Sequence, residues 1–127
     1  MRKLVGYVLA VLLVFGAGVA VGQKTAAPRK TLLHSFSFKT VAGATPAQLD
    51  ELWAATRKLA SQSPEIKQIW MGKIVGHSSD WQYNIVMEFD DAAGHDKYAK
   101  SPAHDEWLKT YSKVREEGTF TIDTQSQ

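Results

Sequence analysis

Two stretches of alternating apolar and polar residues constrain the fold of this chain most strongly. In residues 31–40 and again in residues 81–89, large side chains recur at every second position. Such alternation is typical of strands that bury one face. We therefore predict a sheet with one apolar face under helices; its members are Leu32, Phe36, Phe38, Ile85, Met87 and Phe89. The opposite face is mixed, and either stays solvated or closes against a second copy; its members are Ser35, Ser37, Met71, Asn84 and Val86.

Helix signals separate the strands. Thr45, Pro46 and Gln48 predict an N-cap, a first helical residue and a capping box, and the 3.6-residue period that follows ends before Pro64. Asp90-Asp91 begins a second, short helix, and a third runs from Pro102 to about residue 117. Further strands are predicted at residues 66–75, with a bulge at Gly72, and at residues 119–124. The order β-α-β-β-α-α-β predicts a ferredoxin-like α+β domain with one four-stranded antiparallel sheet.

The N-terminal segment is expected to lie outside this domain. Met1-Arg2-Lys3 is basic, residues 4–21 carry no charge, and small residues follow up to Gly22. This order is typical of a secretory signal peptide. We predict a signal peptide at residues 1–22, a linker at 23–30 and the domain at 31–127, exported to the periplasm or secreted. The alternative is an uncleaved membrane anchor at residues 4–21, which is just long enough to span a bilayer.

Charge and cysteine content exclude some classes of function. The chain has 15 Lys and Arg and 13 Asp and Glu, so removal of Arg2 and Lys3 with the signal peptide leaves 13 of each sign. A neutral domain has no basic excess that would favour nucleic acid. There is no cysteine, and hence no disulfide. A domain of this size has a modest core and often gains from pairing with a second copy.

A tyrosine and a histidine flank the strongest helix break. Tyr98 ends one helical pattern, Ser101-Pro102 stops it, and His104 lies in the first turn of the next helix. A helix N-terminus disfavours the imidazolium, so His104 is suited to accept a proton, and Tyr98 could orient a carbonyl oxygen. The alternative for both residues is structural: His104 caps the helix or packs, and the ring of Tyr98 packs under the proline turn.

The remaining histidines and large aromatic residues also have a structural and a functional interpretation. His34 lies on the apolar face, as a hydrogen-bonded core histidine or as a polar group of a cavity. The large aromatic residues either fill the core or form the wall of a pocket for a flat ligand; they are Trp53, Trp70, Trp81, Tyr83 and Trp107. His77 and His95 do not fit a shared site. His104 and Asp105 lack the spacing of a metal site, so we predict no metal and no cofactor.

Three motifs resemble the stress-responsive dimeric α/β-barrel (Dabb) family: Phe36-Ser-Phe38-Lys39, Trp70-Met71-Gly72-Lys73 and Tyr98-x-x-x-Pro102-Ala103-His104. The resemblance implies that two sheets pair into a barrel and that each subunit has a small apolar cavity between sheet and helices. One branch of the family consists of cofactor-free polyketide cyclases, whose Tyr and His in the third motif act as an acid/base pair. These cyclases also have a histidine in the first strand, and Leu32 stands at that position here. His34 lies two residues later and, by strand alternation, faces the same way.

We therefore expect an exported, homodimeric barrel of the stress-response type that binds a small aromatic or apolar molecule. The residues expected to line its cavity are His34, Phe36, Trp70, Tyr83 and Trp107. The alternative is a cofactor-free cyclase or lyase that uses Tyr98 and His104, or a monooxygenase-like barrel enzyme. No nucleic-acid partner is expected. Contact with a membrane is expected only if the N-terminal segment stays uncleaved.

Overall fold

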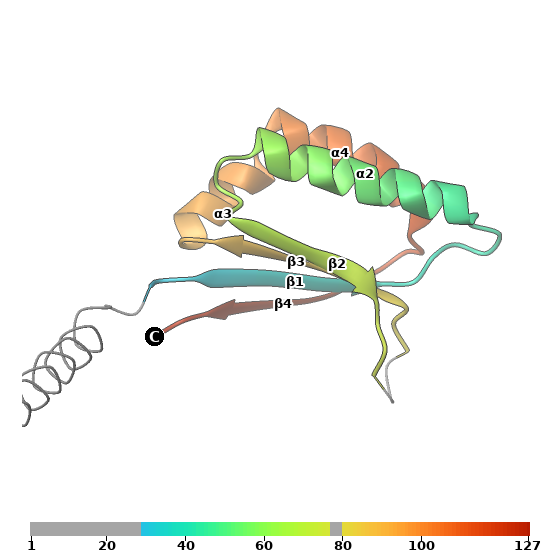
Figure 1. Ribbon diagram of the computed structural model, residues 1–127, viewed down its shortest axis with the longest axis horizontal. Coiled ribbons are helices and arrows are strands. Elements are labelled where there is room, and N and C mark those ends of the chain that lie inside the picture. Colours follow the sequence, from blue (N-terminus) through green and yellow to red (C-terminus); the bar gives the residue numbers. More distant parts are fainter. Residues whose placement is uncertain (1–28, 77–79) are drawn as a thin grey trace, which may run out of the picture.

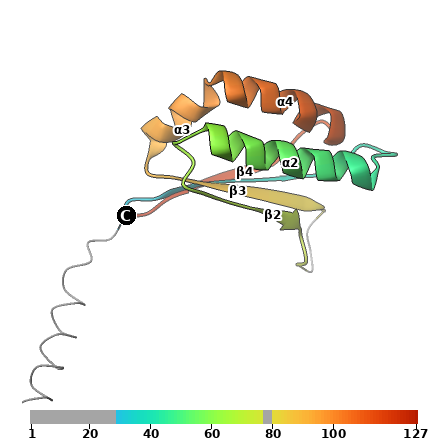
Figure 2. The same cartoon turned by 45° about the horizontal axis from the view of Figure 1, so that its top comes forward.

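The structure, a computed structural model, describes residues 29–76 and 80–127 and shows one sheet covered by helices on a single face (Figures 1 and 2). The strands are β1 (Leu32–Phe38), β2 (Gln68–Lys73), β3 (Tyr83–Phe89) and β4 (Phe120–Gln125), and the helices are α2 (Pro46–Gln62), α3 (Ala92–Ala99) and α4 (Pro102–Val114). The strand order is β2-β3-β1-β4, with every neighbouring pair antiparallel. The predicted ferredoxin-like architecture is confirmed. The predicted signal peptide lies outside the described residues, and no helix within them is both long and apolar enough to cross a membrane.

The core lies between the central strands and the helices. In the register of β1 with β3, Leu32 is opposite Phe89 and Phe36 is opposite Ile85, and all four side chains are buried. The apolar face predicted from the alternation is therefore confirmed. Each fully buried side chain of this size stabilises the fold by about 1.5–3 kcal/mol relative to its exposed state. Helices α2 and α4 lie side by side over this face, and α3 covers one end of it (Figure 1).

Helix α2 begins where the sequence predicts. The Thr45 hydroxyl accepts a hydrogen bond from the Gln48 N–H at 3.3 Å, and the Gln48 side chain accepts one from the Thr45 N–H at 2.8 Å. These two bonds complete the capping box. They satisfy N–H groups that the first turn would otherwise leave without a partner.

Strand β2 corrects three sequence predictions. Met71 pairs with Ile85 and so lies on the helix-covered face, whereas Trp70 pairs with Val86 on the open face and is 46% exposed. The predicted bulge at Gly72 is wrong, because the register with β3 continues through Gly72 without an interruption. Apolar residues lie on both faces of β2, so its pattern cannot say which face is buried, and only the pairing with β3 decides.

The open face of the sheet is partly apolar. Its large exposed side chains are Trp70, Phe120 and Ile122. Between them, the Asn84 amide donates to the hydroxyls of Ser35 and Ser37, both at 3.2 Å. Because these polar groups bond one another, covering this face would leave few of them without a partner.

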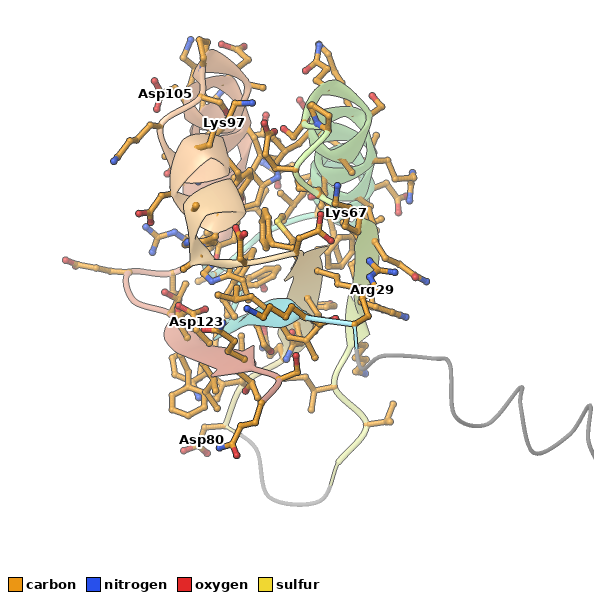
Figure 3. All side chains as sticks on the ribbon, turned by 90° about the vertical axis from the view of Figure 1, so that its left-hand side faces the viewer. Arg29, Lys67, Asp80, Lys97, Asp105 and Asp123 are labelled. Carbon is orange, nitrogen blue, oxygen red and sulfur yellow. The ribbon has the colours of Figure 1, made fainter. Side chains whose placement is uncertain are left out.

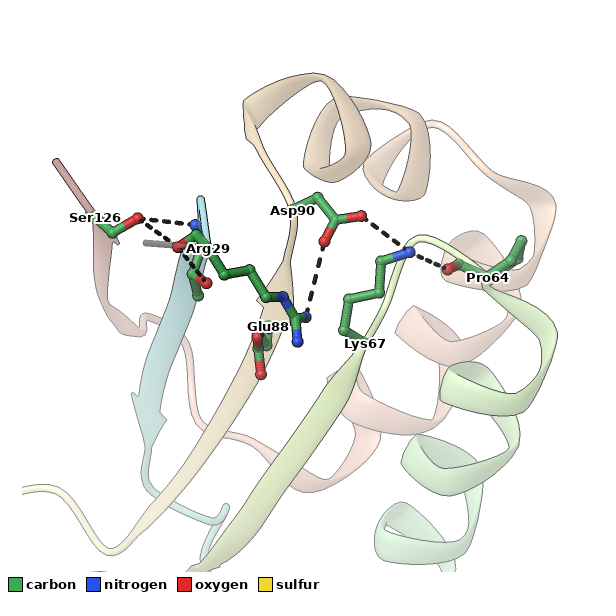
Figure 4. Close-up of polar contacts among 7 residues, drawn as sticks. Arg29, Pro64, Lys67, Glu88, Asp90 and Ser126 are labelled. Carbon is green, nitrogen blue, oxygen red and sulfur yellow. Dashed lines mark hydrogen bonds and ion pairs between the residues drawn. The ribbon is translucent and has the colours of Figure 1, made fainter. Parts of the chain in front are cut away.

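The beginning of the domain is fixed to the sheet at one end. Arg29 lies 3.0 Å from the Glu88 carboxylate and 3.8 Å from that of Asp90, and Lys67 lies 3.1 Å from Asp90 (Figure 4). The Ser126 hydroxyl donates to the Arg29 carbonyl at 3.4 Å. Exposed ion pairs contribute about 0–1 kcal/mol each. The ion pairs of Arg29 hold the segment before β1 beside the end of β3, and the Ser126 hydrogen bond holds it beside the end of β4.

Candidate functional site

The junction of α3 and α4 places a phenol and an imidazole on either side of a proline. Tyr98 is buried in the last turn of α3, and His104 is half-buried in the first turn of α4. The Ser101 hydroxyl caps α4 by accepting a hydrogen bond from the His104 backbone N–H at 3.2 Å. Pro102 occupies a first-turn position, where no intrahelical N–H bond is lost. The helix break predicted from the sequence is confirmed.

The rings of Tyr98 and His104 meet edge to face. Their centroids are 4.8 Å apart and their planes are inclined by 66°. The Nδ1 atom of His104 is buried and has no hydrogen-bond partner among the described residues. The contact between the two rings is therefore one of packing, and it leaves the buried Nδ1 atom without a hydrogen bond to the phenol.

Burial fixes the protonation of these two groups at neutral pH. Desolvation lowers the pKa of His104, against the opposing effects of the Asp105 carboxylate and the Ala99 backbone. Desolvation also raises the pKa of Tyr98, and the neighbouring Tyr111 acts in the same direction. The imidazole is thus held neutral and can accept a proton, whereas the phenol stays protonated and acts as a hydrogen-bond donor.

Both rings line an open pocket of about 200 Å³ between the sheet and α4. The pocket lies over β1 and β4. Its lining residues are His34 and Phe36 of β1, Tyr98 and His104 at the helix junction, Trp107, Leu108 and Tyr111 of α4, and Arg115, Thr119 and Thr121 beyond it.

Three aromatic rings form one wall of the pocket. Trp107 and Tyr111 stack at 4.6 Å between centroids, and Phe36 meets both of them edge-on at 5.9 and 5.7 Å. The Trp107 Nε1–H donates to the Thr56 hydroxyl at 3.0 Å, and that hydroxyl donates to the Leu52 carbonyl at 2.8 Å. Helix α2 thereby fixes the orientation of the indole that faces the pocket.

A second polar group on the pocket is a histidine held by a carboxylate. The Nδ1 atom of His34 lies 2.6 Å from the Asp123 carboxylate on β4, which Figure 3 shows below α3. An ionised carboxylate only accepts hydrogen bonds, so the proton of the imidazole lies on Nδ1. This leaves Nε2 as the ring nitrogen that can bond to a further group. His95 packs against this pair, with its ring centroid 4.6 Å from that of His34. Desolvation, followed by the proximity of His34, lowers the pKa of His95.

Sequence reasoning missed two residues at the far end of the pocket. Tyr111 is buried with its hydroxyl unpartnered, and the Nε of Arg115 is also buried without a partner among the described residues. Burial raises the pKa of Tyr111, which keeps its hydroxyl a donor. Arg115 was predicted inside α4, but the helix ends at Val114 because Arg115 bridges to Thr40 in extended conformation. This early end turns Arg115 toward the pocket.

The family model for the stress responsive A/B barrel domain (Dabb) matches residues 32–125, nearly the whole described domain. The chain belongs to the Dabb family. No match to this Dabb chain was found among curated proteins.

Solved structures with the same fold include a protein described as dimeric and one described as an enzyme. A hydroxynitrile lyase from Passiflora edulis is 17% identical, with a TM-score of 0.70 over 79% of this chain and 96% of its own. A dimeric ferredoxin-like protein of unknown function from Thermobifida fusca is 20% identical, with a TM-score of 0.66 over 80% and 95%. A Dabb protein from Mesorhizobium loti is 17% identical, with a TM-score of 0.66 over 75% and 95%. At these identities the likeness shows the fold alone.

The residues expected to line the cavity separate into two groups in this Dabb domain. His34, Phe36 and Trp107 line the pocket. Tyr83 lies away from it, stacked on Phe38 at 5.6 Å and packed edge-on against Trp53 at 5.9 Å. Trp70 lies on the open face of the sheet, as described above, because its place in the register is set by β3.

The prediction that His95 shares no site with the other histidines is wrong. His95 was not expected to share a site, but its ring contacts His34 and lies 5.9 Å from that of Tyr98. His77 lies outside the described residues. Among the residues described, no group of three His, Cys, Asp or Glu side chains is placed to hold a metal ion.

Proposed function

We propose that this protein is a homodimeric small-molecule-binding Dabb protein whose ligand is a compact aromatic compound with polar substituents. The observation that carries the proposal is a convergence of unpartnered atoms: His104 Nδ1, the Tyr111 hydroxyl and Arg115 Nε are all buried, and all three residues line one pocket. A buried polar group without a hydrogen bond costs about 1–3 kcal/mol. These atoms are closed off from water, so a ligand recovers this free energy where its binding shifts the pocket side chains enough to reach them.

The size and the wall of the pocket favour a single ring. A cavity of about 150 Å³ lined by apolar residues is sufficient for benzene, and the pocket here is about 200 Å³. The rings of Phe36, Trp107 and Tyr111 present faces and edges at the separations that aromatic pairs prefer. The extra volume leaves space for one or two polar substituents.

A ligand screen with matched variants tests this proposal. Single-ring aromatic compounds are screened by NMR, with the Trp107 indole N–H as the reporter at the pocket wall. We expect His104→Ala and Tyr111→Phe to weaken the compounds that bind, whereas Lys58→Ala on the exposed surface of α2 leaves their affinity unchanged. The proposal fails if both pocket variants keep wild-type affinity for every compound that binds.

The dimer is supported by the open sheet face and by the dimeric neighbours. Trp70, Phe120 and Ile122 are each about half exposed there, at 46, 50 and 49%, and proteins of the same fold are described as dimeric. Closing this face against a second copy would remove all three side chains from water. Each Å² of apolar surface buried in this way stabilises the dimer by about 25 cal/mol.

A second candidate is a cofactor-free lyase or cyclase. It is favoured by the arrangement of a neutral imidazole at His104, a protonated phenol at Tyr98 and a carboxylate-held imidazole at His34 around one pocket. A structural neighbour is described as a hydroxynitrile lyase. In such a reaction on a cyanohydrin, His104 would accept the proton of the substrate hydroxyl and Tyr98 would donate a hydrogen bond to the developing carbonyl oxygen. The carbon–carbon bond to cyanide breaks, and cyanide leaves with the electron pair and takes up the proton from the His104 imidazolium.

Release of aldehyde from an aromatic cyanohydrin tests this candidate. We expect His104→Ala to lower kcat by about 10²–10⁴-fold, the usual share of general acid–base catalysis, and Tyr98→Phe to lower it as well. Lys58→Ala is again the control. If the wild-type chain releases no aldehyde faster than buffer does, this lyase reaction is ruled out and the binding function stands by itself.

We also propose export, supported by the basic start, the uncharged residues 4–21 and the small residues up to Gly22. N-terminal sequencing of the exported protein should begin at Gln23. An intact N-terminus in the membrane fraction would instead favour the anchored alternative.

A further inference from the structure

The positive charge of Arg115 has no counterion in the part of the chain that the structure describes. Over residues 29–76 and 80–127, no carboxylate lies within ion-pair distance of its guanidinium. Its Nη1 donates to the Glu116 carbonyl at 3.2 Å, and its Nε is buried without a partner. A guanidinium has five N–H donors, so most of its hydrogen-bonding capacity is unused.

The guanidinium is held in place by both its backbone and its neighbouring ring. Arg115 forms a bridge with Thr40, and its N–H donates to the Tyr111 carbonyl at 3.0 Å. The guanidinium carbon lies 5.1 Å from the centre of the Tyr111 ring, which is within cation–π distance. The charge is therefore fixed at the rim of the aromatic wall.

A second unpartnered donor belongs to Tyr111, the residue whose ring lies under this charge. The Tyr111 hydroxyl is buried and unpartnered, and its residue is only 4% exposed. At the other end of the pocket the charge of Asp123 is already engaged by His34 at 2.6 Å. The free donors at the Arg115 end thus have no acceptor of their own, and the pocket carries an uncompensated positive charge there.

We infer that the ligand of this pocket is an aromatic carboxylate, whose ring packs on Trp107 and Tyr111 and whose carboxylate is bound by Arg115. The inference rests on the proposed binding function and adds the charge of the ligand to it. Carboxylates match the planar guanidinium with two parallel hydrogen bonds.

The test is a calorimetric comparison of benzoate with benzamide, which have nearly the same shape and differ in charge. With the full chain, we expect benzoate to bind at least about tenfold more tightly, the equivalent of one charge-assisted hydrogen bond. Arg115→Gln should remove this difference by weakening benzoate alone. Arg115→Lys keeps the charge and loses the planar fork, so its affinity for benzoate should lie between that of the wild type and that of Arg115→Gln. The control is Arg57→Gln, on the exposed surface of α2.

The outcomes separate this inference from the proposed function. Equal affinity of the wild-type chain for benzoate and benzamide overturns the inference and leaves aromatic binding intact, and this comparison needs no variant to fold. An equal loss of both ligands in Arg115→Gln, with an unchanged melting temperature, overturns it as well. If neither probe nor any neutral single-ring compound binds, the proposed function and the inference fail together. A benzoate affinity that falls with rising salt supports the inference, because exposed charge pairs are screened.

Discussion

The hydrogen bond from Trp107 to Thr56 offers the sharpest test of how the pocket wall is held. Thr56 is fully buried, and its hydroxyl accepts from the Trp107 Nε1–H at 3.0 Å while it donates to the Leu52 carbonyl at 2.8 Å. Thr56→Val keeps the side-chain shape and removes the hydroxyl. The Leu52 carbonyl keeps its helical N–H partner, whereas the indole N–H, on a residue only 4% exposed, loses its acceptor.

The expected cost is that of one buried donor without a partner. This is about 1–3 kcal/mol in the free energy of unfolding, and in a domain of this size it lowers Tm by about 4–8 °C for each kcal/mol. Urea unfolding followed by far-UV circular dichroism measures it, since that signal does not depend on the tryptophans. The matched control is Thr110→Val, at a partly exposed position of α4, with an expected change within about 0.5 kcal/mol.

A double-mutant cycle separates the hydrogen bond from packing. Trp107→Phe removes the donor and part of the ring, and so costs stability by leaving a cavity. In the double variant with Thr56→Val no donor is left without a partner, so the loss should be smaller than the sum of the single losses by about 1 kcal/mol. Additive losses, or a Thr56→Val variant as stable as the wild type, would refute the reasoning.

Three further predictions concern the dimer, the response to pH and the histidine–carboxylate pair. Ile122→Lys places a charge in the open sheet face and should convert a dimer into a monomer in sedimentation equilibrium. The pKa values of His104 and His95 are lowered by burial from the ordinary 6.5. The unfolded chain therefore binds more protons as the pH falls through 6.5, and the free energy of unfolding should decrease below that pH, measured by urea titration. In Asp123→Asn the carboxylate that holds His34 is lost, so imidazole ¹⁵N spectra should show a change of tautomer at His34.

Each of these three predictions has an outcome that contradicts it. A stable Ile122→Lys dimer would place the interface on another face. Stability that is constant or rises as the pH falls from 7 to 5 would mean that neither imidazole is desolvated in solution. Unaltered His34 resonances in Asp123→Asn would mean that the two side chains do not bond.

Local patterns predicted the framework of the site because its determinants are close together in the sequence. The capping box of Thr45 and Gln48 and the stop at Ser101-Pro102 each depend on residues within four positions, and the structure confirms both. The apolar face of β1 followed from its strict alternation. These elements bring Tyr98 and His104 together.

The parts that escaped prediction depend on pairing between distant segments. His34 and Asp123 are 89 residues apart and meet only through the register of β1 with β4. Arg115 leaves the helix because it bridges to Thr40, which local helical periodicity cannot indicate. Trp70 was assigned to the wrong layer because β2 is apolar on both faces and only its neighbour fixes its orientation.

The ion pairs of Arg29 determine how far this domain could move from a membrane. They fix the chain to Glu88 and Asp90, at the sheet end where Ser126 also lies (Figure 4). Were residues 4–21 to remain in a bilayer, only residues 22–28 would separate it from this point, a span of at most about 25 Å. The domain would then be confined to a thin layer above the membrane. Two such copies would meet by diffusion in two dimensions, at a far higher effective concentration than free domains.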